Sequence, residues 1–207
     1  MSVQINTPGS KPKAPATPIE TSHNDAAKTF THIHPILVLS LYAYKFPSIV
    51  ADPVNALMES LVWLGILQIA YVAVCLPPTG SANVVAEKRK PGERKRAVAG
   101  KLERELGGKI IPAFLSLTLS VLPAIPILFA TLVLFGAPIT THYFETLLCA
   151  AHISLLAILP LVYVHGVDGE RWREIVALLL PVDSVFGGMV GAFVGAWLGA
   201  VPIPLDW

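Results

Sequence analysis

Five long apolar stretches decide what this chain can fold into. Each approaches the roughly 20 consecutive apolar residues that a helix needs to cross the hydrocarbon core of a bilayer. Hydrophobic residues make up 54% of the 207 and charged residues only 14%, which is typical of a polytopic membrane protein. The sequence therefore predicts an all-α bundle of about five transmembrane helices within residues 32–207, with spans near residues 33–50, 55–76, 110–135, 143–164 and 175–201.

The N-terminal segment, residues 1–31, differs from the rest of the chain. It is polar and carries Pro8, Pro12, Pro15 and Pro18, which predicts a disordered tail. It shows neither the apolar core nor the small-residue cleavage site of a secretory signal. We therefore expect the first span to act as the targeting signal.

The longest connection, residues 77–109, is basic. Its lysines and arginines outnumber its glutamates, and the positive-inside rule places such a loop in the cytoplasm. Counting spans from this loop puts the N-terminus in the cytoplasm as well and the C-terminal end of the fifth span on the far side. Within the loop, the stretch from Arg94 to Leu106 fits a short helix that Gly107 and Gly108 would end. Its basic side chains either serve only to retain the loop or also contact anionic lipid headgroups.

Prolines in the third and fifth apolar stretches bear on their shape. Pro123 and Pro126 lie near the middle of the third, where we expect a kink whose unbonded carbonyls neighbouring helices must cover. Pro181 lies early in the fifth stretch, two residues before Asp183.

Among the ionisable residues of the predicted spans, two are candidates for an intramembrane role, His152 in the fourth and Asp183 in the fifth. Such groups are costly in lipid and usually face protein or water. His152 fits either a hydrogen bond between helices or a role in catalysis or proton transfer. Asp183 is either a functional intramembrane carboxylate or the cap of a helix that restarts after Pro181.

The fifth stretch carries a ridge of small residues. Gly187, Gly191, Gly195 and Gly199 recur every four residues, and a second series runs one step behind them, made up of Gly188, Ala192, Ala196 and Ala200. On a helix, positions four apart lie nearly above one another, so both series form one continuous stripe. In lipid such a stripe lets another helix approach closely. The approaching helix could belong to a partner chain or to this chain, and the sequence leaves both open.

The ridge leads into a distinctive ending. Pro202 and Pro204 stop the helix, and Asp206 and Trp207 supply a charge and an amphipathic ring where a span leaves the bilayer. The run from Gly195 to Ala200, followed by Pro-Ile-Pro-Leu-Asp-Trp, resembles the signature of the PIG-F/GPI11 family, ER membrane proteins of glycosylphosphatidylinositol (GPI) anchor synthesis. In that family the motif normally continues into one more span, so we expect this chain, which ends at Trp207, to be a shortened form.

The resemblance implies a function and partners. Members of the family are non-catalytic accessory subunits that stabilise the enzymes adding ethanolamine phosphate to the mannose residues of the anchor precursor. The implied partners are ethanolamine phosphate transferases of the PIG-O/GPI13 and PIG-G/GPI7 type, in a setting of ER membrane lipids, with no nucleic acid. The implied location is the ER membrane, with the Pro-Ile-Pro-Leu-Asp-Trp motif on the luminal side.

The segments expected on the luminal side hold few groups for catalysis. The candidate metal ligands there are Asp52, His142, Glu145 and Asp206, too few and too scattered for the metal site that transfer of a phosphoryl group requires. No nucleophile motif, phosphate-binding glycine loop or zinc-spaced Cys/His cluster is present. The sequence predicts no catalytic residue, no metal and no cofactor, which argues against a self-contained transferase.

A second class of function stays open. A lipid-handling or transporter-like membrane protein would supply phosphatidylethanolamine or the glycolipid substrate. Asp183, His152 and Lys45 would then line a polar groove, and an accessible cavity containing these three side chains would favour this alternative.

Overall fold

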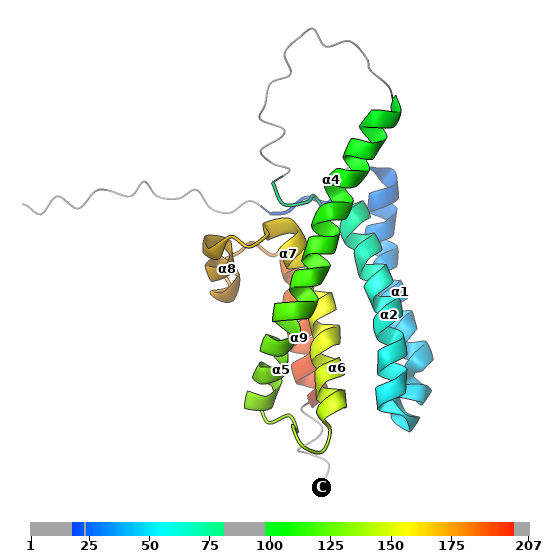
Figure 1. Cartoon of the computed structure of the whole chain (residues 1–207), viewed down its shortest axis with the longest axis vertical. Helices are drawn as coiled ribbons and strands as arrows, with labels where there is room; N and C mark the ends of the chain where they lie inside the picture. The colour runs from blue at the N-terminus through cyan, green and yellow to red at the C-terminus, as the bar shows by residue number, and fades with distance from the viewer. Residues whose placement is uncertain (1–17, 23, 81–97, 201–207) are drawn as a thin grey trace, which may run out of the picture.

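The computed structural model describes residues 18–22, 24–80 and 98–200. Within them the chain is helical, and no strand occurs in these ranges. Figure 1 shows the long helices running up and down along a common axis, with α1 and α2 at one side. The elements are α1 (Asp25–Ala51), α2 (Pro53–Cys75), α4 (Val98–Leu119), the π-helical turn η1 (Ser120–Ala124), α5 (Ile125–Leu134), α6 (Tyr143–Ile153), the π-helical turn η2 (Ser154–Ile158), α7 (Leu159–His165), α8 (Gly169–Val176) and α9 (Ser184–Ala200).

The helical membrane bundle predicted from the sequence is confirmed. Four helical segments among the described residues are long and apolar enough to cross a membrane: Asp25–Ala51, Pro53–Cys75, Gly107–Leu134 and Tyr143–His165. A fifth apolar helix, Ser184–Gly199, is shorter. The fifth predicted range, near 175–201, is divided in the structure, because α8 ends at Val176 and α9 begins at Ser184.

The bundle is organised around its fourth span. Of the apolar window in Tyr143–His165, 72% is buried within the protein, against 6% for the window in α1. The spans α2, α4–α5 and α9 pack around this central segment, and α1 packs on α2. The outer spans therefore present most of their apolar side chains to the surroundings, as a lipid-embedded bundle requires.

The first helix starts earlier than the sequence suggests. The sequence predicts a tail that ends at residue 31 and a first span that begins at residue 33, but α1 begins at Asp25. Ala27 is fully buried, and the Cys75 thiol donates a hydrogen bond to its carbonyl oxygen at 3.4 Å. This packing against the end of α2 explains why the polar first turns are helical. Residues 1–17 of the tail lie outside the described residues.

The helix expected to end at Gly107–Gly108 does not end there. α4 runs without a break from Val98 to Leu119, so residues 98–109 of the predicted loop belong to a helix. Glycine ends a helix by adopting a left-handed conformation. Among the described glycines, positive φ values occur at Gly80, Gly136 and Gly166, and neither Gly107 nor Gly108 adopts one. The proposed lipid contacts of the remaining loop fall on residues 81–97, outside the described ranges.

Two π-helical turns meet inside the bundle. η1 contains Pro123, where the sequence predicts a kink, and η2 immediately precedes α7. A π-turn and a proline both disturb the regular backbone ladder. The Ser154 hydroxyl donates a 2.7 Å hydrogen bond to the carbonyl oxygen of Ser120, so the irregular turn of one span is bonded to the irregular turn of the other.

A short turn joins α1 to α2 at the end of the bundle opposite α7 and α8 (Figure 1). The Asp52 carboxylate accepts a hydrogen bond from the Asn55 amide at 3.3 Å, and Pro53 occupies the first turn of α2. The hairpin is also held by an ion pair, with 2.7 Å between Lys45 Nζ and Glu59 Oε2. Lys45 thus has a carboxylate partner on the neighbouring helix.

The opposite end of the bundle, which we call the basic end, carries residues 18–22, residues 77–80, α8 and the start of α9. Gly166 terminates α7 there with φ +64°, and a Cβ on it would lie 2.9 Å from the Thr79 hydroxyl oxygen. The Thr79 amide donates a 2.8 Å hydrogen bond to the carbonyl oxygen of Tyr163, which keeps Thr79 in place. Gly166 is therefore required both by its backbone conformation and by the close approach of Thr79.

We predict that Gly166→Ala lowers the free energy of unfolding by about 1–3 kcal/mol, because alanine would be strained at this φ and would collide with Thr79. Thermal unfolding of the purified protein in detergent measures the effect. Gly136→Ala is the matched control, since Gly136 also has a positive φ, +100°, but an added Cβ meets nothing within 4 Å. Equal losses for the two variants would show that the contact with Thr79 contributes nothing.

Candidate functional site

The ridge of α9 is uncovered along its glycine series, whereas Ala192 and Ala196 of the second series pack against the hydrophobic core. One face of the helix, with Val185, Phe186 and Met189, is buried, and α9 packs mainly on η2. On the glycine face, an added Cβ at Gly188, Gly191, Gly195 or Gly199 meets nothing within 4 Å. Gly187 differs, because its Cβ would touch Val182 Cγ1 at 3.5 Å. The described chain therefore does not use Gly191, Gly195 and Gly199 for its own packing.

The ending that follows the ridge is not described. Pro202, Pro204, Asp206 and Trp207, the predicted luminal motif, lie outside the described residues. Their role stays a prediction from the sequence.

Asp183 lies at the start of α9 and is fully engaged with the backbone. Its Oδ1 accepts hydrogen bonds from the amides of Val185 and Phe186, at 2.9 and 2.8 Å. Its Oδ2 accepts a 2.9 Å hydrogen bond from the amide of Ile19. The carboxylate thus caps α9 after the break at Pro181 and also ties the N-terminal segment to the bundle.

Sequence reasoning missed the partner of Asp183, because Ile19 belongs to the range expected to be a tail. Besides the bond from Ile19, the Ser22 amide donates a 2.8 Å hydrogen bond to the carbonyl oxygen of Cys75 at the end of α2. Ile19 also packs against the hydrophobic core. The one available signal was an isoleucine within a polar segment, too weak to indicate a fixed position.

His152 lies between helices, in the interior of the bundle. Its Nε2 is 3.1 Å from the Ser60 hydroxyl of α2, and its Nδ1 is 2.7 Å from the carbonyl oxygen of Leu148. The ring also makes a tilted contact with Tyr42 of α1, with 5.9 Å between ring centroids. His152 therefore links three helices, which is the geometry of an interhelical polar contact in a membrane protein.

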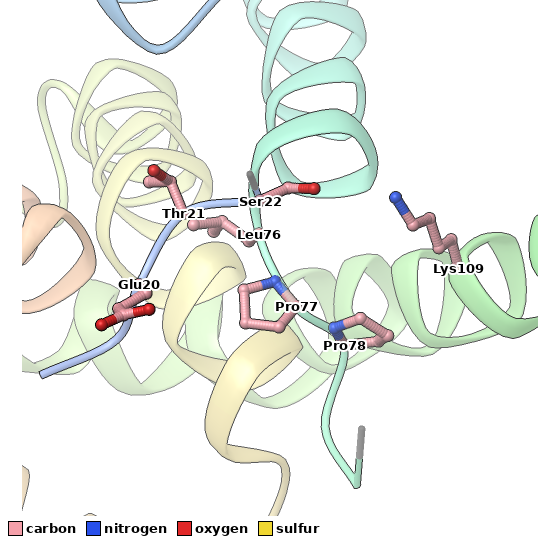
Figure 2. Close-up of a pocket in the computed structure, with 7 residues that line it drawn as sticks. All are labelled: Glu20, Thr21, Ser22, Leu76, Pro77, Pro78 and Lys109. Carbon is pink, nitrogen blue, oxygen red and sulfur yellow. The ribbon is translucent and has the colours of Figure 1, made fainter. Parts of the chain in front are cut away.

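An open pocket lies at the basic end (Figure 2). Its two ionisable residues, Glu20 and Lys109, lie on opposite sides of Pro77 and Pro78 and do not converge on one point. The pocket is lined by Glu20, Thr21, Ser22, Leu76, Pro77, Pro78 and Lys109. This lining includes none of His152, Asp183 and Lys45, and the structure places these three residues in separate contacts with Ser60, backbone amides and Glu59. The polar groove that a lipid-handling protein would need from them is not formed within the described part of the chain.

The described ranges contain no cluster of metal-ligating side chains. No group of three or more His, Cys, Asp or Glu side chains there could hold a metal ion. His142 precedes α6 and contacts the neighbouring Thr141 hydroxyl at 3.0 Å. Asp206, another ligand candidate from the sequence, lies outside the described residues.

These features define a polytopic helical membrane protein. Its glycine face on α9 is open and suited to packing against another helix. Comparison with known families then identifies it more closely. The family profile described as "GPI biosynthesis protein family Pig-F" matches residues 33–207, and the chain belongs to this family.

Relatives of the chain agree with that assignment. The chain is 45% identical to "Glycosylphosphatidylinositol anchor biosynthesis protein 11" of Aspergillus fumigatus, in an alignment covering 100% of this chain and 78% of the relative. It is 42% identical to the protein of the same name in Neurospora crassa, over 92% of this chain and 68% of that protein. It is 26% identical to the mouse "GPI ethanolamine phosphate transferase, stabilizing subunit", over 87% and 78%. No solved structure matches the chain.

We predict a graded loss of stability in two variants of Asp183. Asp183→Asn keeps an oxygen for the amides of Val185 and Phe186 but turns a donor toward the amide of Ile19, and we expect a loss of about 1 kcal/mol. Asp183→Ala removes all three bonds and should cost more, about 2–3 kcal/mol. Thermal unfolding in detergent measures both. Limited proteolysis should show faster cleavage within residues 18–22 in both variants, and unchanged cleavage in Asp183→Asn would mean that the bond to Ile19 does not hold the segment.

We predict that Ser60→Ala lowers the free energy of unfolding by about 1–2 kcal/mol, because it leaves a nitrogen of buried His152 without its partner. Thr118→Ala is the control, since the Thr118 hydroxyl bonds only to the Phe114 carbonyl of its own helix and is exposed. The same thermal assay compares them. If the loss of unfolding free energy is no larger than that of the control, the Ser60–His152 contact does not help to hold α2 to α6.

Proposed function

We propose that this protein is a non-catalytic stabilising subunit of the enzymes that add ethanolamine phosphate to the GPI-anchor precursor in the ER. Its partners would be ethanolamine phosphate transferases of the PIG-O/GPI13 and PIG-G/GPI7 type. The proposal is supported by membership of the Pig-F family and by similarity to proteins named for GPI-anchor biosynthesis and for stabilising that transferase.

The observation that carries the proposal is the open glycine face of α9. In lipid, helices associate through van der Waals contact and interhelical hydrogen bonds rather than through burial of apolar surface from water. A face without side chains lets the backbone of a partner helix come close over several turns. Gly191, Gly195 and Gly199 form such a face, and the described chain leaves it free. A transmembrane helix of a transferase subunit is the partner that we assign to it.

The orientation of the bundle fits this role. The basic connection between α2 and α4 favours a cytoplasmic position for the basic end, under the positive-inside rule. With that orientation α9 would run toward the lumen, the side on which the sequence predicts Pro202, Pro204, Asp206 and Trp207. A partner helix packed along α9 would thereby be held close to the luminal motif.

We predict that Gly191→Leu and Gly195→Leu each reduce recovery of the transferase when the tagged protein is purified from detergent-solubilised membranes. Leucine at these positions fills the space that the partner backbone would occupy. The fold of the isolated chain should survive, because an added Cβ meets nothing within 4 Å at either position. Its thermal stability should be unchanged or raised, since glycine is unfavourable in a helix interior by about 0.5–1 kcal/mol relative to alanine.

Val194→Leu is the matched control, because Val194 is exposed on the same helix, already carries a branched side chain and also gains bulk. It should leave transferase recovery at the wild-type level. Full recovery with both glycine variants would exclude the glycine face from the interface. A loss of recovery that parallels a loss of thermal stability would mean that the variants damaged the fold and not the contact.

A further inference from the structure

Four large apolar side chains lie exposed between the last residue of α8 and the start of α9. Val176 is 80% exposed, Leu178 66%, Leu179 71% and Val182 83%. We call these four residues the α8–α9 patch. Such a cluster of exposed apolar side chains marks a surface that contacts another protein or the membrane.

The α8–α9 patch belongs to a segment that packs beside the membrane-spanning part of the protein. Figure 1 shows α8 at the side of the bundle, level with α7, rather than beyond its end. Leu180, inside the same connection, is buried in the hydrophobic core cluster together with Leu161 and Tyr163 of α7. Since α7 is the last part of a membrane span, the connection lies at the depth of that span's end.

The connection is bonded where it leaves α8, which favours entry of this part into an apolar phase. The amides of Ala177, Leu178 and Leu179 donate to carbonyl oxygens of Arg173, Ile175 and Glu174, at 2.9, 3.1 and 2.9 Å. Pro181 has no amide hydrogen to satisfy. Asp183 then bonds the first free amides of α9. Irregular backbone without such partners would be excluded from the lipid.

The end of α8 places a leucine where glycine is usual. The bonds from Leu178 and Leu179 form a helix-ending motif whose left-handed position normally holds glycine, yet Leu178 occupies it with φ +55°. A bulky side chain is strained in this conformation. In water an exposed leucine would gain nothing to offset this strain, whereas among acyl chains its side chain is removed from water.

The opposite face of α8 is charged. Glu170 pairs with Arg173 at 3.0 Å and Arg171 with Glu174 at 2.9 Å. Trp172 anchors the helix to the bundle, since its indole nitrogen donates a 2.9 Å hydrogen bond to the Gly166 carbonyl oxygen. A charged face beside exposed leucine and valine, with a tryptophan between them, is the arrangement of a helix in a membrane interface.

We propose that the α8–α9 patch is immersed in the acyl chains of the leaflet at the basic end, with the charged face of α8 among the headgroups. We assign lipid rather than protein as the occupant, because the patch lies at the depth of a span's end and beside the charged face of α8. Its large side chains also differ from the glycine face of α9, which suits close packing by a helix. α8 and its C-terminal turn then form an interfacial anchor that fixes the depth at which α9 starts. This proposal does not depend on the proposed function.

The test uses a fluorescent label on the full chain in phosphatidylcholine liposomes. Leu179→Cys and Val182→Cys are labelled with an NBD fluorophore in a background where Cys75 and Cys149 are replaced by serine. Glu170→Cys and Arg173→Cys, on the charged face of α8, are the matched controls. Only variants that elute as the parent protein in gel filtration are used, and Val176→Cys replaces either patch variant that does not.

Labels on the patch should emit at shorter wavelength than the control labels. They should also lose more fluorescence when the liposomes contain phosphatidylcholine with a doxyl quencher near the top of its acyl chain. Water-like emission at the patch, equal to that of the controls, would overturn the proposal. Short-wavelength emission without quenching by the doxyl lipid would also overturn it, because the patch would then be covered by protein, either a second copy or another segment of the chain.

Discussion

Lipid offers no hydrogen bonds, and the need to satisfy backbone polar groups within the protein governs this fold. Regular helices meet that need by themselves, so the informative places are those where the helix is broken. At the π-turn around Pro123, the Ser154 hydroxyl of a neighbouring span bonds the Ser120 carbonyl. At the break around Pro181, both carboxylate oxygens of Asp183 bond backbone amides. At each of these two breaks, a polar side chain therefore forms hydrogen bonds with backbone groups.

The same constraint separates structural polar groups from functional ones. His152 and Asp183 are the residues that an intramembrane position first marks as functional candidates. Their contacts are those of structural elements, because His152 joins α6 to Ser60 of α2 and Asp183 joins α9 to the N-terminal segment. With these groups engaged, the described membrane-spanning helices expose mainly apolar side chains, and the glycine face of α9 is a packing surface among them. Membership of the Pig-F family and similarity to a protein named as a transferase's stabilising subunit support an accessory role.

Much of the architecture was accessible from the sequence, because hydropathy reports directly on the exclusion of polar residues from lipid. The second span, predicted near 55–76, is observed as Pro53–Cys75, and the fourth, near 143–164, as Tyr143–His165. The errors arose where a local signal did not decide the outcome. Gly107 and Gly108 favour a helix end, yet α4 continues through them, and Asp25 follows a polar stretch, yet it begins α1 because Ala27 is buried against α2.

The sequence by itself determined that the chain is a helical membrane bundle, where most of its spans lie, and which family its C-terminal motif indicates, because these properties depend on composition and local order. Two questions needed the tertiary structure. The sequence left Asp183 as either a functional carboxylate or a cap. In the structure its carboxylate accepts a hydrogen bond from the backbone amide of Ile19, a residue far away in the sequence. The sequence also left the glycine ridge facing either inward or outward. Periodicity defines a stripe on a helix but not the direction it faces, and the burial of Val185, Phe186 and Met189 turns Gly191, Gly195 and Gly199 outward.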